Sequence, residues 1–447
     1  MKKPNVIFVF TDQLRYQATG FGGDPNVRTP HLDRLASMSL NFTTAVSGCP
    51  VCSPARASLL TGQYADKHGV FVNDVCLSND AVSIAEAFKE ANYDTAYIGK
   101  WHVDGHGRSN YIPPERRQGF DFWKVLECTH NYNQSYYYAG NDTEKRLWDG
   151  YDTIAQTREA QGYIQDHATQ KPFLLMLSWG TPHAPYQTAP ERYQKLYNPE
   201  DLTLHPNVPP EIEDEARRDL AGYYAHIVAL DELIGDLLET VKESGIEENT
   251  VFVFWSDHGD MLGSQGERKK QRPWDESIHV PLLIYYPNRF GGQGRCIDTP
   301  INTPDLMPTL LSMCEMPIPS TVQGNDYTPF LDGKADAPAD AALIACYHPF
   351  GQYTRKQGGK EYRGVRTNRY TYVRDLDGPW LLYDNAHDPF QLNNLVENRD
   401  ADAVLKELDE TLEELLDQLG DEFLSSEEYL KAWGYVTDEN GTVPYTN

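Results

Sequence analysis

Residues 52–62 carry the group in this chain that is best suited to nucleophilic chemistry. Their sequence is CSPARASLLTG. Ser53 is a residue type that caps helices, Pro54 suits the first helical position and Gly62 suits the end, so we predict a helix here. Cys52 would lie at the positive end of the helix dipole, which stabilises an anionic nucleophile or a bound oxyanion. Arg56, one turn further on, could direct its guanidinium at the same anion.

Two simpler interpretations of Cys52 remain open. A single cysteine before a helix is often only a small buried residue. Cys49 and Cys52 also have the C-x-x-C spacing of a redox pair. The redox interpretation is disfavoured, because the surrounding chain is far longer than a redox domain and contains no separate small βαβ unit around the pair.

Two acid-bearing segments follow two predicted buried strands. Asp12 and Gln13 come after the strand at 6–10, and Asp257 and His258 come after the strand at 250–255. In an open α/β sheet, ligands gather at the carboxyl ends of the strands, so these side chains should meet. Oxygen ligands suit Ca²⁺ or Mg²⁺, whereas the nitrogen of His258 lets Mn²⁺ compete. We therefore predict one divalent cation, with Ca²⁺ favoured; the alternative is that the two aspartates only cap or turn the chain.

The motif Cys52-x-Pro54-x-Arg56, followed by Leu60-Thr61-Gly62, resembles the signature of type I sulfatases. This family belongs to the alkaline phosphatase superfamily, and the resemblance runs in the family's order through nearly the whole chain. It implies that a maturation enzyme oxidises Cys52 to formylglycine, an aldehyde that is hydrated to a diol. One hydroxyl of the diol attacks sulfur, and the other then loses its proton, which expels sulfate and restores the aldehyde.

The resemblance also places the metal ligands at Asp12, Gln13, Asp257 and His258. Many family members have Asp at the position of Gln13 and Asn at the position of His258, so this chain departs from both. The departures lean towards phosphonate or phosphate ester hydrolases of the same superfamily, which are the alternative enzyme. A non-catalytic binder of sulfated glycans is the alternative of another class, and it is disfavoured because every expected catalytic position is filled.

The remaining catalytic positions are also implied by the resemblance. Arg56 and Lys100 would orient the nucleophile and hold the charge of the sulfate, and His102 would be the base that collapses the sulfated intermediate. His183 and Lys270 would stabilise or protonate the leaving oxygen, although Lys269 lies only one residue away. Taken singly, such lysines and histidines usually face solvent. Together they would supply a positive pocket in an acidic chain.

The elements that must position these residues follow from short apolar runs that alternate with amphipathic stretches. This pattern predicts an α/β fold with a large, mostly parallel sheet sandwiched by helices, and the resemblance to sulfatases implies that the fold is like that of alkaline phosphatase. After about residue 335, short runs separated by turns indicate antiparallel strands, followed by an acidic helix at 401–419 that ends at Gly420. We therefore predict a catalytic domain over 1–335 and a C-terminal α+β subdomain over 336–447. The predicted elements of the first domain are strands at 6–10, 95–98, 172–178, 250–255 and 280–286 and helices at 83–92, 152–167 and 217–244.

The composition of the chain limits the kinds of molecule that it is expected to bind. The chain of 447 residues has a formal net charge of −27, which argues against nucleic acid and against an anionic membrane surface. The seven cysteines are too few and odd in number for a disulfide scaffold. The apolar run at 5–10 is too short for a signal peptide, so the chain is expected to be cytoplasmic as written, or periplasmic or secreted if a leader has been removed.

The expected substrate is a sulfated carbohydrate. Tyr132, Tyr136, Tyr137 and Tyr138, with Trp101 and Trp123, offer aromatic faces for sugar rings, and Asn131, Asn133 and Asn141 offer polar partners. Ordinary core and loop aromatics are the competing interpretation. Segments around Cys128 and Arg272 look similar to bacterial carbohydrate sulfatases, including those acting on 6-sulfated N-acetylglucosamine. The strong negative charge favours one terminal sugar over a long polymer, and His348 and Arg363 are suggested to close the pocket around it.

Overall fold

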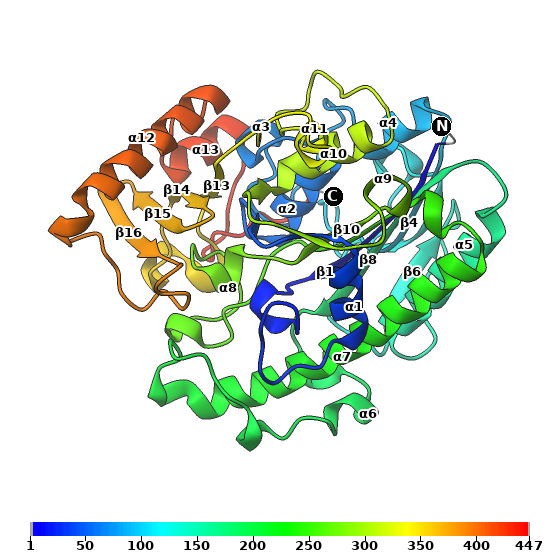
Figure 1. Ribbon diagram of the computed structural model, residues 1–447, viewed down its shortest axis with the longest axis horizontal. Helices are drawn as coiled ribbons and strands as arrows, with labels where there is room; N and C mark the ends of the chain where they lie inside the picture. The colour runs from blue at the N-terminus through cyan, green and yellow to red at the C-terminus, as the bar shows by residue number, and fades with distance from the viewer. Residues whose placement is uncertain (1–2, 446–447) are drawn as a thin grey trace.

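The computed structural model describes residues 3–445, which fold around a ten-stranded sheet of order β11-β2-β10-β9-β1-β8-β4-β5-β6-β7 (Figure 1). Its parallel centre consists of β9 (Thr250–Ser256), β1 (Asn5–Asp12), β8 (Phe173–Pro182), β4 (Asp94–Lys100) and β5 (Phe122–Leu126). Antiparallel pairs continue it through β10 (Leu282–Tyr285) and β2 (Leu40–Phe42) on one side and β6 (Tyr136–Ala139) and β7 (Arg146–Leu147) on the other. Strand β11 (Arg295–Ile297) forms an edge, so the sheet as a whole is mixed.

Helices cover both faces of this sheet, which explains why β1 is buried at every position. Val6, Phe8 and Phe10 pack in one cluster with residues of α2 (Cys52–Thr61), α4 (Ile84–Glu90) and α10 (Leu306–Met313). Ile7 and Val9 point the other way, because side chains alternate along a strand. They pack with α1 (Pro30–Met38), α5 (Asp152–His167) and α7 (Glu213–Glu243), of which α5 and α7 cross the lower right of Figure 1.

Short elements fill the connections between these layers. Strand β3 (Ala45–Val46) pairs with β12 (Ile301–Asn302) in a separate two-stranded sheet. The short helices are α3 (Ala65–His68), α6 (Glu191–Gln194), α8 (Asp275–Ile278), α9 (Pro287–Phe290) and α11 (Thr328–Leu331). Among residues 3–445, no helix combines the length and apolar character that a membrane crossing requires.

The C-terminal part is a four-stranded antiparallel sheet with helices on its outer side (Figure 1). Its strands are β13 (Ala341–Cys346), β14 (Tyr362–Thr367), β15 (Tyr370–Asp375) and β16 (Gly378–Asp384), in that order. The helix α12 (Asp402–Leu419) buries leucines against one face, and α13 (Ser426–Trp433) follows it. The other face shares an apolar cluster with Met261 and Trp274, which precede the C-terminal part in the chain. The division into 1–335 and 336–447 stays a prediction.

The predicted fold class is confirmed, and each strand and helix predicted from the apolar runs is present within a few residues of its predicted bounds. The start of α2 differs from the prediction. The N-cap is Val51, with no side-chain cap, and the hydroxyl of Ser53 has no partner among residues 3–445. Pro54 is therefore the third helical residue, which is tolerated because the first N–H groups of a helix have no partner in the helix. Gly62 ends α2 in the left-handed conformation with φ 64°, as predicted.

Candidate active site

The predicted site residues meet at the carboxyl ends of the central strands. Strands β1 and β9 pair in parallel with Thr11 opposite Ser256, so the residues that end β1 and follow β9, Asp12 and Asp257, lie side by side. Strand β4 brings Lys100 to the same edge. The N-terminus of α2 adds Cys52, and all of these side chains are buried.

Four side chains form a cluster that fits a divalent cation. Ligand atoms of Asp12, Cys52, Asp257 and His258 lie within 4.8 Å of one another. Nε2 of His258 is 3.6 Å from an oxygen of Asp12 and 3.6 Å from an oxygen of Asp257. These separations are too long for hydrogen bonds, but they suit groups that share one ion. Burial and the nearby carboxylate of Asp12 raise the pKa of Asp257, a repulsion that a cation would relieve.

Gln13 joins this cluster through its backbone and its amide. Its N–H donates to Oδ1 of Asp257 at 3.1 Å, and its Oε1 accepts from Nζ of Lys270 at 3.0 Å. Its Nε2 donates to Oδ2 of Asp260 at 2.6 Å, and the hydroxyl of Tyr186 donates to the same oxygen at 2.6 Å. Gln13 also has φ 76°, a conformation that costs free energy for a non-glycine residue and is common at functional sites. Asp260 thus keeps the amide oxygen of Gln13 turned towards the cluster.

Cys52 lies in the middle of the charged groups. Its Sγ is 3.1 Å from Nζ of Lys270, 3.2 Å from Nε2 of His258 and 3.6 Å from Oδ1 of Asp12. Burial and Asp12 raise the pKa of the thiol, but Lys100, Lys270 and His258 outweigh them and hold it well below its ordinary value. A depressed pKa favours the reactive anionic form of the side chain.

Arg56 makes all its hydrogen bonds inside the cluster. Its Nη2 is 3.1 Å from Asp12 and its Nε is 3.1 Å from Asp257. Its Nη1 donates to the carbonyl of Lys100 and to the hydroxyl of Ser178. Because it contacts both carboxylates, the guanidinium holds Asp12 and Asp257 together. The side chain is 1% exposed. That it also holds the charge of a sulfate stays a prediction.

Lys100 and His102 approach the cluster from β4 and the loop after it. Nζ of Lys100 is 2.5 Å from Oδ2 of Asp12, and Nε2 of His102 is 3.1 Å from Oδ1 of Asp74. Burial lowers the pKa of His102, but Cys128 and Asp74 outweigh it and raise the pKa well above its ordinary value. The protonated ring can hold an anion, and it must release its proton before it can act as the predicted base. Its Nδ1 is buried and has no partner among residues 3–445.

His183 and Lys270 complete the cluster, while Lys269 does not enter it. Lys270 is 6% exposed and touches both Cys52 and Gln13, whereas Lys269 is exposed. Nδ1 of His183 pairs with the carbonyl of Ala184 at 2.8 Å, and burial and Lys270 hold the pKa of His183 well below its ordinary value. The neutral ring therefore has Nε2 left as an acceptor.

Several residues of the site were not predicted from the sequence. Asp74 contacts His102, Ser178 contacts Arg56, and Asp260 contacts Gln13. Cys128 is a second buried thiol whose pKa burial raises, yet His102 and Lys100 lower it well below its ordinary value. Two of them had a signal in the sequence: Asp260 follows the predicted ligands Asp257 and His258 within the same short segment, and Cys128 lies in a segment that resembles carbohydrate sulfatases.

The suggestion that His348 and Arg363 close a substrate pocket is wrong for Arg363 and finds no support for His348. The side chain of Arg363 is 0% exposed and binds Asp421 and Tyr429. The ring nitrogens of His348 pair with the hydroxyl of Ser426 and the carbonyl of Gly441. Both side chains hold the C-terminal part together, because their polar atoms are already satisfied there.

The predicted aromatic platform is only partly available. Trp101, Trp123 and Tyr132 are 0–2% exposed and belong to the packed interior. The hydroxyl of Tyr132 donates to the carbonyls of Gly180 and His183 and so holds the backbone of the segment that carries His183. Of the predicted tyrosines, Tyr136 is 46% exposed and can meet a ligand.

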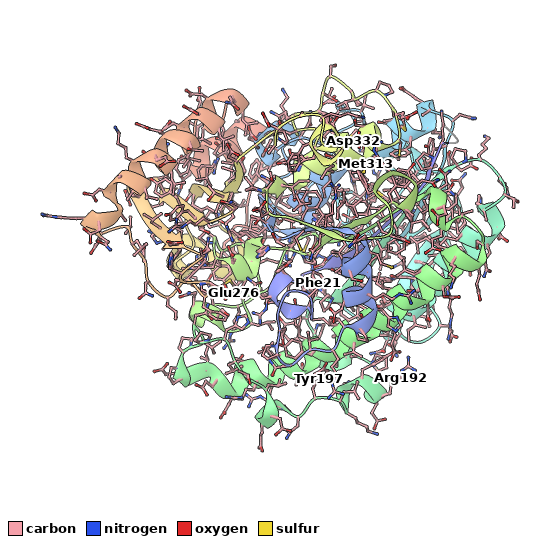
Figure 2. The ribbon with its side chains drawn as sticks, viewed as in Figure 1. Phe21, Arg192, Tyr197, Glu276, Met313 and Asp332 are labelled. Carbon is pink, nitrogen blue, oxygen red and sulfur yellow. The ribbon has the colours of Figure 1, made fainter. Side chains whose placement is uncertain are left out.

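A cavity of about 590 Å³ lies away from this cluster, beside α9, α10 and α11. Its lining includes Met313 and Asp332, which are labelled together at the top of Figure 2. Arg289 bridges them, since it donates to the carboxylate of Asp332 and to the carbonyl of Met313. Since this guanidinium is already paired and no predicted nucleophile or metal ligand lines the cavity, the cluster around Cys52 is the better candidate for catalysis.

Comparisons with known proteins agree with this geometry. The family model described as "Sulfatase" matches residues 4–316, and the one described as "N-sulphoglucosamine sulphohydrolase, C-terminal" matches residues 263–418. The chain is 46% identical to the "Ulvan-active sulfatase" of Formosa agariphila, over 99% of this chain and 87% of that protein. It is 27% identical to the "N-acetylglucosamine-6-O-sulfatase" of Bacteroides thetaiotaomicron, over 94% and 87%. A solved structure concerned with the metabolism of multiple glycosaminoglycans by Bacteroides thetaiotaomicron superposes with a TM-score of 0.85 at 30% identity, over 96% of this chain and 99% of that one.

Proposed function

We propose that this chain, which belongs to the sulfatase family and is a sulfuric ester hydrolase, removes sulfate from a carbohydrate with a nucleophile made from Cys52. The observation that carries the proposal is the position of Cys52. Its Sγ lies within 3.6 Å of a lysine, an imidazole and a carboxylate, in a buried cluster at the carboxyl ends of the central strands. Lys100, Lys270 and protonated His102 concentrate positive charge there, which suits an anionic sulfate ester in a chain of net charge −27.

The family implies a resident cation, and the donor set supports one. Asp12, Gln13, Asp257 and His258 would hold it, with Arg56 fixing the two carboxylates and Asp260 fixing the amide of Gln13. Such an ion acts as a Lewis acid that eases loss of a proton from the attacking hydroxyl. Three oxygen ligands favour Ca²⁺ and also suit Mg²⁺, whereas the imidazole nitrogen lets Mn²⁺ compete.

Formylglycine at position 52 is part of the proposal, and it would supply a hydroxyl nucleophile that can be regenerated after sulfate leaves. Cys52 is 0% exposed in the folded chain. A maturation enzyme must therefore reach this residue before the fold closes around it. This burial supports a separate maturation partner that acts on the unfolded chain.

The side chains around the nucleophile have different roles in binding the sulfate and in releasing the leaving group. Lys100 and protonated His102 hold the negative oxygens of the sulfate, and Asp74 fixes the ring of His102. Lys270 has an ammonium 3.1 Å from Cys52 and is placed to stabilise or protonate the leaving oxygen. His183 has a depressed pKa and helps as a neutral hydrogen-bonding group.

A phosphonate or phosphate ester hydrolase is the second candidate, because Gln13 and His258 replace residues that are common in sulfatases. The pair Lys100 and His102 favours the sulfatase. A non-catalytic glycan binder fits poorly, since all the catalytic positions are filled and converge. Among carbohydrates, the similarity to an ulvan-active enzyme is the stronger one, and 6-sulfated N-acetylglucosamine remains a specific candidate.

Mass spectrometry of the Cys52 peptide tests the nucleophile, and a substrate panel tests the reaction. We expect conversion of the thiol to the aldehyde, and turnover of sulfated mono- and disaccharides above that of an aryl phosphonate. Cys52→Ala should lower kcat by about 10⁴-fold or more, because covalent catalysis fails without its nucleophile. The matched control is Cys49→Ala, which removes a neighbouring buried thiol whose pKa burial raises, and which should retain activity.

A wild-type rate in Cys52→Ala would remove Cys52 from the mechanism. Turnover of the aryl phosphonate alone would replace the sulfatase reaction by its alternative.

A further inference from the structure

A line of ionic contacts leads from the catalytic cluster to the protein surface. His102 is 2% exposed and pairs with Asp74, which is 4% exposed. Asp74 in turn pairs with Arg108, whose side chain is 42% exposed, at 2.9 Å. The line begins at the buried ring of His102 and ends in a guanidinium that is partly open to solvent.

Arg108 has hydrogen-bonding capacity left for a ligand. Its Nε and Nη2 donate to the carboxylate of Asp74, and its Nη1 has no acceptor within residues 3–445. A guanidinium has five N–H donors, so a second anion can be bound without displacing Asp74. Asp74 fixes the plane of the guanidinium, which lowers the entropy lost when a ligand binds.

Two aromatic side chains, His130 and Tyr445, lie near this line. The ring of His130 stacks on His183 with centroids 4.5 Å apart. The tail after α13 turns back towards the catalytic sheet (Figure 1), and it brings the half-buried Tyr445 next to Asp74 and Arg108. We call Arg108, His130 and Tyr445 the rim. Its members come from three separate segments of the chain.

We propose that Arg108 recognises a second anionic group of the substrate, on or next to the sugar that carries the reacting sulfate, while His130 and Tyr445 flank that sugar. The inference rests on the proposed function and names the class of its substrate. The substrate is an acidic sugar, which bears either a uronate carboxylate or another sulfate. Both groups present two coplanar or clustered oxygens to a guanidinium.

The position of Arg108 explains how a strongly acidic protein admits such a substrate. A net charge of −27 repels a polyanion at a distance. Within a few ångströms, however, a fixed and partly desolvated cation outweighs the screened field of the surface. Recognition of the second anion is therefore local, and it should appear in the binding of one sugar unit.

The test is the kinetics of four matured proteins on four substrates. The proteins are the wild type, Arg108→Ala, Arg108→Lys and Arg116→Ala. Arg116 is the matched control, because it lies in the same connection between β4 and β5 and pairs with the buried Asp104, and among residues 3–445 no hydrogen bond or ion pair joins that pair to His102. The substrates are an aryl sulfate, a neutral monosulfated sugar, the same sugar linked to a uronic acid, and a disulfated sugar.

We expect Arg108→Ala to lose about tenfold or more in kcat/KM on one of the doubly charged sugars, mainly through KM, relative to its loss on the singly charged substrates. Arg108→Lys should keep part of this preference, and Arg116→Ala should keep all of it. Whichever doubly charged sugar responds identifies the carboxylate or the sulfate. The singly charged substrates report any indirect effect through Asp74 and His102.

An equal loss in Arg108→Ala on all four substrates would overturn the inference and leave the proposed function standing. If the wild type turned over the aryl sulfate and none of the sugars, the carbohydrate proposal would fall, whatever Arg108 does. The two failures are therefore distinguishable.

Discussion

Arg56 and Arg363 are two buried arginines in different parts of the molecule, and they look alike by the usual criteria. Their side chains are 1% and 0% exposed. Arg56 pairs with two carboxylates and Arg363 with one, and in each case burial lowers the pKa of the arginine but the partners outweigh burial and raise it. Burial, ion pairing and the direction of the pKa shift therefore do not tell which of the two belongs to an active site.

The difference lies in what their surroundings leave unsatisfied. Arg363 meets Asp421, the hydroxyl of Tyr429 and two carbonyls, so one cation faces one carboxylate. Arg56 belongs to a cluster with two further cations, Lys100 and Lys270, and His102, which lies near Lys100, has a ring nitrogen with no partner among residues 3–445. A balanced cluster stabilises the fold. A cluster with surplus charge and unused donors is built for a ligand, which is the more useful sign of function.

The largest expected effect comes from removing a surplus cation. Lys270→Ala should lower kcat by about 10²–10⁴-fold on a sulfate ester, because the ammonium beside Cys52 is lost from the transition state. Lys269→Ala is the matched control, since Lys269 is exposed and should stay near the wild-type rate. Steady-state kinetics measure both, with thermal unfolding as a check of folding. A loss below about tenfold for Lys270→Ala together with a larger loss for Lys269→Ala would shift the role to Lys269.

The next effect concerns stability in the balanced cluster. Arg363→Ala should lower the free energy of unfolding by about 3–5 kcal/mol, because Asp421 is left buried without its cation. Arg369→Ala removes an ion pair with Asp384 whose arginine is 48% exposed, and it should cost at most about 1 kcal/mol. Urea unfolding measures both changes. If Arg363→Ala remained as stable as Arg369→Ala but lost activity, the distinction between the two clusters would be wrong.

The strands and the candidate cluster could be predicted from the sequence because both leave local signals. Strands β1 and β9 have apolar centres, since both of their faces are buried, and the candidate site residues lie at or just after their ends. The partners of those residues leave no such signal. Asp74 is 28 positions from His102, and only the fold brings them together.

Exposure could not be predicted from the sequence either. Arg363 and Trp101 were expected at the substrate, but the fold buries both. Tyr445 lies at the far end of the chain from Asp74, so no spacing rule could place it on the rim.

The smallest effect is expected at Asp260, which acts on the predicted metal site indirectly, through its hydrogen bond with Gln13. The carboxylate of Asp260 accepts a hydrogen bond from Nε2 of Gln13 and so turns the oxygen of that amide towards the other predicted metal ligands. Outer partners of metal ligands are typically worth about 10–100-fold in metal affinity. Asp260→Ala should weaken the binding of Ca²⁺ or Mn²⁺ by this amount, because the amide of Gln13 is then able to turn over.

Two further variants sharpen the test. Asp260→Asn keeps an acceptor oxygen for Nε2 of Gln13 and should weaken metal binding less than Asp260→Ala does. Tyr186→Phe removes one hydrogen bond to Asp260 and should also have a small effect on metal binding. Isothermal titration of the metal-free proteins measures the affinity independently of turnover, and their thermal midpoints in chelator show whether the fold has changed. Equal affinities in all three variants and the wild type would mean that Gln13 is oriented by Lys270 alone, through the hydrogen bond from its Nζ to Oε1.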